Sequence, residues 1–201
     1  MERLLKYGGL IPAIALAGVL TMGSASAAIY TSSGSCLVGD MSAAADECFG
    51  SVLPTPVNDS ESLLNDNTFG TETGLFGHTD WDFLARENTP GGLSGTDIGL
   101  SVTPSGGAPS GSWSVNSGAL DTFARVVLLL KSGNTFSSYL YEPGSNAGSF
   151  GTWTTSALGN TELSHFSIYT SGMNPVPVPA AVWLFGTALL GFIGISRRTR
   201  V

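Results

Sequence analysis

One segment places a histidine and two carboxylates at alternate positions, a spacing that could hold a metal ion or perform acid–base chemistry. It reads His78-Thr-Asp80-Trp-Asp82. Alternate side chains of a β-strand point to the same face, so His78, Asp80 and Asp82 would lie together. The same alternation arises if that face meets water while Trp81 and Phe83 pack inward. We favour this second interpretation, because it needs no further residues to explain the pattern.

Other candidate catalytic groups are scattered along the sequence. Glu142 and Glu162 would suit a glycosidase only if the fold brought their carboxyl groups together. His165 is predicted to point outward from a strand, beside Phe166. Serine is abundant, but there is no G-x-S-x-G elbow, and Gly92-Leu-Ser-Gly95 lacks that spacing. We therefore predict a protein that is not an enzyme and has no cofactor and no metal site.

Four aromatic residues raise the alternative of a carbohydrate-binding module. Trp113, Tyr139, Tyr141 and Trp153 could form a platform on which sugar rings stack. Large aromatic side chains more often fill the core of a β-rich domain, and we favour that role for these four.

The elements that would position these groups are short β-strands separated by Gly, Ser, Asn and Pro. Apolar and polar residues alternate in segments 80–83, 97–103, 112–116 and 165–169, as in strands with one buried face. In the last segment the pattern predicts that Phe166 and Ile168 face the core, and that His165, Ser167 and Tyr169 face water. Many short strands without an amphipathic helix predict an all-β domain, an antiparallel β-sandwich or jelly roll.

Two segments depart from simple alternation. Val126–Leu130 is apolar throughout, which predicts a central strand covered on both faces. Lys131-Ser-Gly-Asn134 should then turn the chain into a second strand, Thr135–Tyr141. Earlier, Asn58-Asp59-Ser60 offers helix N-caps before a short helix of one or two turns that starts at Glu61. We expect only turn and cap roles for these three polar residues.

Residues 28–175 lie between two apolar terminal segments, which are described below. The net charge of this region limits the kinds of partner it can bind. It holds three basic residues (Arg86, Arg125 and Lys131) against fourteen acidic ones, a net charge of −11. Such a domain does not attract nucleic acid or an anionic lipid surface by charge. Its acidic residues lack the spacing of a calcium-binding EF-hand loop, so solubility is the simplest role for the charge.

Cys36 and Cys48 are the only cysteines in the sequence. An even number of cysteines in an exported chain predicts a disulfide bond, here one that closes a short loop. A metal site would need further ligands, and the two histidines lie far away in sequence.

Residues 1–27 have the features of a secretory signal peptide. Arg3 and Lys6 form a positive start, and residues 8–22 are apolar. Ala25-Ser-Ala27 then supplies an A-x-A cleavage site, so we expect cleavage between Ala27 and Ala28.

The stretch from 176 to 201 has three parts in a fixed order. Pro177-Val178-Pro179 comes first, and the apolar residues 180–195 follow, with Thr187 as their single polar side chain. These 16 residues would form a helix of about 24 Å, short for a bilayer core of about 30 Å. Arg197, Arg198 and Arg200 come next and would stop the segment at the cytoplasmic side.

These three parts together resemble the PEP-CTERM sorting domain of Gram-negative bacteria. Val178 stands where the family's name implies a glutamate. The resemblance implies recognition by an exosortase, a membrane-embedded processing enzyme, and release or transfer of the outer domain. It also implies an association with exopolysaccharide and biofilm.

The expected organisation is therefore a signal peptide (1–27), an outer β-rich domain (28–175) and a sorting tail (176–201). We expect a protein that is exported across the inner membrane and anchored there transiently by its tail. It would then reach the cell surface or extracellular matrix, with exosortase and exopolysaccharide as partners and no nucleic acid. A carbohydrate-binding module and a secreted hydrolase are the alternatives. The first would need exposed aromatic rings in a groove, and the second converging catalytic groups in a pocket.

Overall fold

The computed structural model describes residues 27–173, except 35, 90, 105, 106, 143, 144 and 146. Within this part, the regular structure is mostly β-sheet with one α-helix, as the sequence predicts. The strands are β1 (Ile29–Ser32), β2 (Glu47–Phe49), β3 (Val52–Leu53), β4 (Thr68–Phe69), β5 (Glu72–Thr73), β6 (Asp82–Asn88), β7 (Leu93–Gly95), β8 (Ser101–Thr103), β9 (Ser110–Ser114), β10 (Phe123–Ser132), β11 (Thr135–Tyr141), β12 (Phe150–Thr154) and β13 (His165–Met173). The helix is α1 (Glu61–Asp66), and two 3-10 turns lie at Val38–Asp40 and Ser156–Leu158.

The largest sheet has six strands in the order β2-β11-β10-β13-β6-β7. Its central strand is β10, which contains the apolar run Val126–Leu130 and is buried on both faces, as predicted. The predicted hairpin is also present, because β10 pairs with β11 from Val126↔Tyr141 to Ser132↔Thr135. A central strand that is covered on both faces has no face in contact with water. Apolar residues are therefore favoured at every position of such a strand, and the apolar run indicates its central place.

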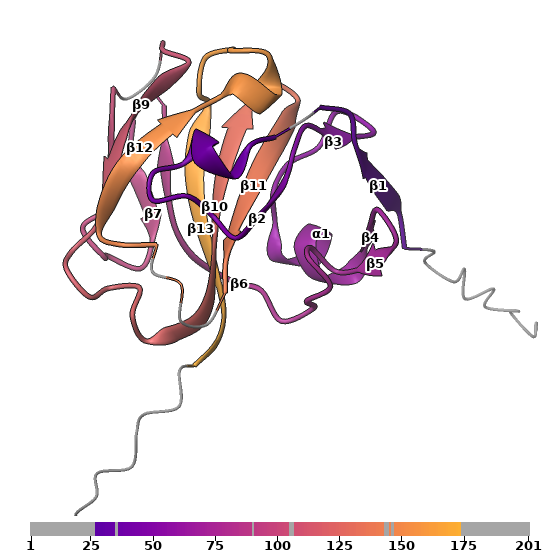
Figure 1. Ribbon diagram of the computed structural model, residues 1–201, viewed down its shortest axis with the longest axis horizontal. Coiled ribbons are helices and arrows are strands. Elements are labelled where there is room, and N and C mark those ends of the chain that lie inside the picture. The colour runs from indigo at the N-terminus through magenta and orange to yellow at the C-terminus, as the bar shows by residue number, and fades with distance from the viewer. Residues whose placement is uncertain are drawn as a thin grey trace, which may run out of the picture.

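A three-stranded sheet, β12-β9-β8, packs on one face of the large sheet (Figure 1). The layer between the two sheets is a core of apolar side chains, including Val102, Trp113, Leu128, Leu130, Tyr139, Tyr141, Trp153, Phe166 and Ile168. The inward residues predicted from alternation in segments 97–103 and 112–116 lie in this core. Trp113 and the ring of Phe166 are stacked, with ring centroids 5.9 Å apart.

The opposite face of the large sheet is covered by a small lobe made of β1, β3, β4, β5 and α1, which we call the N-terminal lobe (Figure 1). A second core fills this layer, with Leu64, Trp81, Val127, Leu129 and Tyr169 among its members. The prediction that His165, Ser167 and Tyr169 face water is therefore wrong. Alternation indicates that the two faces of a strand differ, but it does not indicate what covers the more polar one.

The N-terminal lobe also departs from purely antiparallel pairing. β1 runs parallel to β4, with Tyr30 opposite Phe69, and antiparallel to β3. A parallel pair needs a long connection between its strands. Here the connection is the chain from 33 to 67, which contributes β2 to the large sheet before it returns to the lobe.

Helix α1 forms where the sequence predicts it. The Ser60 hydroxyl accepts a hydrogen bond from the Leu63 backbone N–H at 3.1 Å, which caps the first turn. At the other end the Asn67 side chain donates to the Leu63 carbonyl at 3.0 Å. The helix buries Leu64 in the second core and thereby fixes Asp59 and Ser60, just before it, against the large sheet.

Candidate functional site

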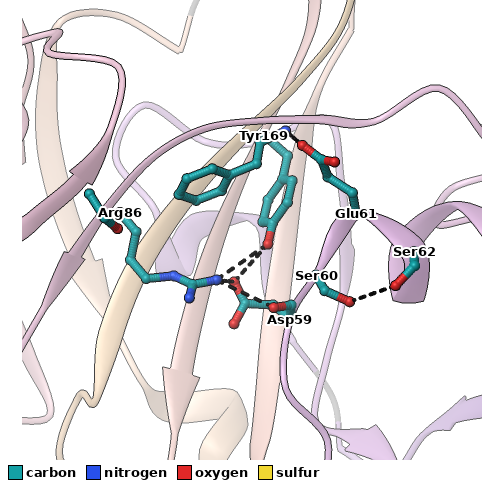
Figure 2. Close-up of a pocket in the computed structure, with 8 residues that line it drawn as sticks. Asp59, Ser60, Glu61, Ser62, Arg86 and Tyr169 are labelled. Atoms are coloured by element: carbon teal, nitrogen blue, oxygen red, sulfur yellow. Dashed lines mark hydrogen bonds and ion pairs between the residues drawn. The ribbon is translucent and has the colours of Figure 1, made fainter.

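A buried carboxylate lies where the N-terminal lobe meets the large sheet (Figure 2). The side chain of Asp59 is fully buried, and Oδ2 accepts hydrogen bonds from Arg86 Nη2 at 2.6 Å and from the Tyr169 hydroxyl at 3.0 Å. Its other oxygen, Oδ1, lies 2.5 Å from Nε2 of His165. Both carboxylate oxygens therefore have partners, as a buried charge requires.

The partners of Asp59 come from two adjacent strands of the large sheet. Arg86 is on β6, and His165 and Tyr169 are on β13. Arg86 sits opposite Ser167 in the ladder between these strands, and its Nε donates to the Ser167 hydroxyl at 2.8 Å. The guanidinium is thus held from two sides, which leaves it little freedom to reorient.

The electrostatics of this cluster favour a charged Asp59. Burial alone would raise its pKa, but the hydrogen bond and charge of His165 and the charge of Arg86 outweigh burial, so the pKa lies well below its usual range. Burial, with the nearby Asp59 charge, raises the pKa of Tyr169, so this hydroxyl stays protonated and donates. Lys131, opposite His165 in the sheet, has its pKa lowered, mainly by burial.

An open pocket of about 520 Å³ lies against this cluster. Its lining comes from the start of α1 and from β6, β7 and β13, and consists of Asp59, Ser60, Glu61, Ser62, Phe83, Arg86, Ser94 and Tyr169. Glu61 is fixed at the rim, because its Oε1 accepts a hydrogen bond from the Phe83 backbone N–H at 2.7 Å. The Arg86 guanidinium carbon lies 5.3 Å from the centroid of the Phe83 ring, within cation–π distance.

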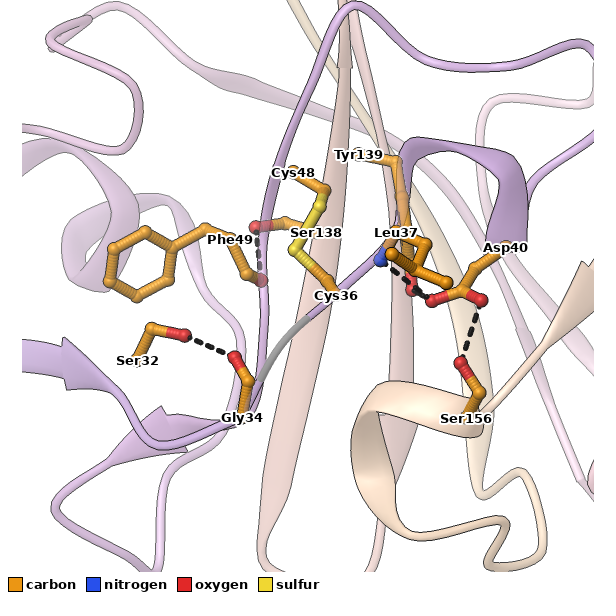
Figure 3. Close-up of a disulfide and its surroundings, with 10 residues drawn as sticks. All are labelled: Ser32, Gly34, Cys36, Leu37, Asp40, Cys48, Phe49, Ser138, Tyr139 and Ser156. Atoms are coloured by element: carbon orange, nitrogen blue, oxygen red, sulfur yellow. Dashed lines mark hydrogen bonds between the residues drawn. A yellow bond between two sulfur atoms is a disulfide. The ribbon is translucent and has the colours of Figure 1, made fainter.

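A second polar cluster surrounds the predicted disulfide bond, which is present between Cys36 and Cys48 (Figure 3). The loop that it closes carries Asp40, whose side chain is nearly buried. Asp40 accepts hydrogen bonds from the Ser156 hydroxyl at 2.6 Å, the Leu37 backbone N–H at 3.1 Å and the Tyr139 hydroxyl at 3.3 Å. These hydrogen bonds hold the disulfide loop against the edge of the core between the two sheets, and we assign them a role in stability.

The segment His78–Asp82 does not form the strand face that would have brought its polar residues together. Strand β6 begins only at Asp82, and Asp80 and Asp82 are exposed. His78 instead lies 3.6 Å from the carboxylate of Glu142. Trp81 is fully buried, as expected, and Phe83 is half-buried. In the described part of the chain, no group of three or more His, Cys, Asp or Glu residues could hold a metal ion.

The structure keeps Glu142 and Glu162 apart. Glu142 follows β11 and lies near Arg125, whose Nε is 3.1 Å from its Oε2. Glu162 precedes β13 at the opposite end of β10, where its backbone carbonyl accepts from Ser132. Arg125 and Ser132 are seven residues apart on β10, or roughly 23 Å along the strand, too far for a glycosidase pair.

The four aromatic residues considered as a sugar platform lie in the first core. Trp113, Tyr139, Tyr141 and Trp153 are each at most 2% exposed. The preferred interpretation, core filling, is confirmed for all four, and they offer no surface for stacking.

Several predicted site residues lie outside the described residues: Pro177, Val178, Pro179, Arg197, Arg198 and Arg200. The same holds for the expected signal segment before residue 27 and the expected membrane helix at 180–195. Ala27 and Ala28, which flank the expected cleavage site, are exposed, and the Ala28 backbone N–H donates to Asn67 Oδ1 at 2.9 Å. Among described residues, no helix has the length and apolar character to cross a membrane.

Sequence reasoning missed the pocket and its main polar residues, Asp59, Arg86 and Tyr169. One signal was available: Arg86 is one of three basic residues between 28 and 175, and it directly follows the apolar residues Phe83-Leu-Ala85. A charged residue at such a position needs a buried partner. Its partner Asp59 lies 27 residues away, and nothing in the sequence pairs the two.

Comparisons of this chain with protein-family models, curated proteins and solved structures give no significant match.

Proposed function

We propose that this chain is an exported protein that an exosortase-type membrane enzyme sorts through its tail to the cell surface or extracellular matrix. The observation that carries the proposal is the order of three features in the tail. Pro177-Val178-Pro179 precedes the apolar residues 180–195, and Arg197, Arg198 and Arg200 follow. The two prolines favour extended backbone, the form in which a protease can reach a peptide bond.

Two features of the folded part support this proposal. The disulfide bond between Cys36 and Cys48 suits an oxidising compartment outside the cytoplasm. Strand β13 ends at Met173, only four residues before Pro177, so the tail follows directly from the large sheet. A short connection of this kind would hold the domain close to the membrane until processing.

The charge distribution supports a role that does not involve nucleic acid. Arg86 pairs with Asp59, Arg125 pairs with Glu142, and Lys131 is buried and donates to the Gly133 carbonyl at 2.5 Å. The three basic side chains of the domain are thus engaged, and most of the acidic ones face solvent. An acidic surface of this kind repels nucleic acid and anionic lipid headgroups.

In finer detail, we propose a jelly-roll-like β-sandwich that is not an enzyme. The two sheets that face each other across the first core support the sandwich. Membrane contact is transient, through residues 180–195, and exopolysaccharide is the associated partner in the matrix. The signal segment is removed between Ala27 and Ala28.

A C-terminal epitope tag tests the sorting proposal. The tag is followed in cells of an exosortase-containing Gram-negative host and in the same host without that enzyme. The expected result is loss of the tag from the mature protein only when the enzyme is present. Replacing Pro177 and Pro179 together by alanine should also leave the tag in place while export continues. A tag that stays on the mature protein in both strains would make residues 176–201 a permanent anchor and refute the proposal.

A further inference from the structure

We propose that the pocket between α1 and strands β6 and β7 is a binding site for pyranose saccharides. This inference is independent of how the chain is sorted, because it rests on the lining of the pocket alone. The volume of about 520 Å³ falls within the range of small-ligand pockets. The pocket is open, so a sugar chain could enter it with one or two units while the rest stays in solvent.

The lining offers both donors and acceptors, which a ligand with many hydroxyl groups can use together. Arg86 donates from Nε and Nη2 to protein groups, whereas within the described chain no protein acceptor lies at its Nη1. The Ser94 hydroxyl also has no hydrogen-bond partner among the described residues. Arg86 and Ser94 are opposite each other in the β6–β7 ladder, so their side chains share the face that forms the floor of the pocket. The Glu61 carboxylate at the rim supplies a strong acceptor.

One apolar surface lies among these polar groups, and it is aromatic. The Phe83 ring is half-buried: the Arg86 guanidinium lies over it, and Tyr169 packs edge-on against it with ring centroids 5.6 Å apart. The C–H face of a pyranose ring packs on an aromatic ring while its hydroxyl groups point outward to polar side chains. A single ring surrounded by hydroxyl, guanidinium and carboxylate groups matches that mixed surface.

Other ligand classes fit the lining less well. A phosphate or another dianion would meet one arginine whose charge is already balanced by Asp59, and Glu61 would repel it. A metal ion would find only Glu61, because both oxygens of Asp59 are engaged by Arg86, Tyr169 and His165. An aliphatic ligand would leave the polar groups without partners, at a cost in binding free energy.

The polar groups of the pocket are also held in place before any ligand binds. Arg86 is fixed by Ser167 and Asp59, and Glu61 by the Phe83 backbone. A preorganised site loses less conformational entropy on binding, which matters for weak ligands such as sugars.

The test uses the purified chain in a detergent without a sugar headgroup, and ligand-observed saturation-transfer NMR. The probes are cellotetraose, maltotetraose and tetragalacturonic acid. We expect saturable binding of at least one neutral probe, which supports recognition of sugar hydroxyl groups. Binding of the acidic probe alone would contradict the proposal, because Asp59 balances the charge of Arg86 and Glu61 repels a carboxylate. Absence of binding by all three would overturn the proposal.

Two variants locate the binding. Phe83→Leu removes the ring but keeps an apolar side chain, and Ser94→Leu fills the floor of the pocket from an exposed position on β7. Each should weaken affinity by about tenfold or more. Ser101→Leu, at an exposed position on β8 in the other sheet, is the matched control and should bind as the parent does. Thermal melts confirm that the variants are folded. Unchanged affinity in both pocket variants would overturn the assignment of the site.

Discussion

Nε2 of His165 lies 2.5 Å from Oδ1 of Asp59, although the two residues are 106 positions apart in the chain. With Arg86 on the other carboxylate oxygen, this contact ties the start of α1 to strands β6 and β13. The N-terminal lobe is therefore joined to the large sheet by a buried ionic cluster as well as by apolar packing. Removing one member of such a cluster should destabilise the fold, because it leaves a buried charge without its partner.

Acid should weaken this connection. The pKa of Asp59 is lower in the folded chain than in the unfolded chain, so its charge stabilises the fold at pH values above about 4, the unfolded pKa. That contribution is lost progressively as the pH falls below about 4. Urea unfolding at pH 7 and pH 3 measures the loss. Asp59→Asn should remove this part of the pH dependence and cost about 3 kcal/mol at pH 7.

A matched control comes from the partly exposed pair of Arg125 and Glu142. Glu142→Gln removes a carboxylate at a side chain that is 37% exposed, and should cost about 1 kcal/mol or less. If Asp59→Asn were as mild as Glu142→Gln, or kept the full pH dependence of the parent, the buried cluster would not hold the lobe.

The disulfide bond should contribute measurably to stability. It closes a loop with a sequence separation of 12, for which chain entropy gives about 3 kcal/mol. Cys36→Ser combined with Cys48→Ser should lower the unfolding free energy by about that amount. Mass spectrometry after alkylation without reduction should find no free thiol in the parent chain. Two alkylated cysteines in the exported protein would contradict the pairing.

A side chain at Gly151 should destabilise the fold, although the backbone conformation there is one that any residue can adopt. A Cβ atom built there would lie 1.7 Å from the Ser42 carbonyl oxygen and 2.8 Å from Trp113 Nε1. Gly151→Ala should therefore push β12 away from the disulfide loop and lower the melting temperature by several degrees. Gly39→Ala is the control, because a Cβ at Gly39 meets no atom within 4 Å. Equal melting temperatures for the two variants would show that β12 can shift freely.

Asn65 should matter more than its place on a six-residue helix indicates. Its side chain makes two hydrogen bonds with the backbone of Trp81, at 2.8 and 2.9 Å, and so positions the chain just before β6. Asn65→Ala should cost about 1–3 kcal/mol in urea unfolding, because both backbone groups lose a partner. Asp66→Ala, at the exposed next position, should have little effect. A loss of similar size in both variants would point to helix propensity instead of these bonds.

Local pattern was enough to predict some elements. The apolar run Val126–Leu130 and the turn residues after it define a central strand and its hairpin without reference to the rest of the chain. Ser60 caps α1 through a hydrogen bond from the backbone of Leu63, three positions later. A cap of this kind can be predicted from the sequence, because both residues lie in one short segment. For the helix cap and the hairpin, the interacting groups are close in the sequence. For the central strand, both faces are buried, so the pattern does not depend on which element covers which face.

The candidate site could not be predicted in the same way. The sequence around Asp59 predicts a turn or helix-cap residue, and the alternation around His165 predicts a strand residue that faces water. Both local patterns are common, so neither indicates a buried ionic cluster. Their true environment depends on the N-terminal lobe folding back over β13, which is a tertiary arrangement with no local signature. The aromatic residues show the same limit, since Trp113 and Phe83 look alike in sequence while only Phe83 lines the pocket.

The strand order of the large sheet determines when this domain can fold as it is made. Strands β10, β11 and β13 lie between β2 and β6 in the sheet, yet all three come after residue 122. A nascent chain that ends before them has β2 and β6 with no strand to join them, so the sheet closes only after β13 is complete. Long-range pairing of this kind folds slowly. For a chain that is exported across a membrane, as we propose, late folding would keep it extended during passage and leave folding to the far side.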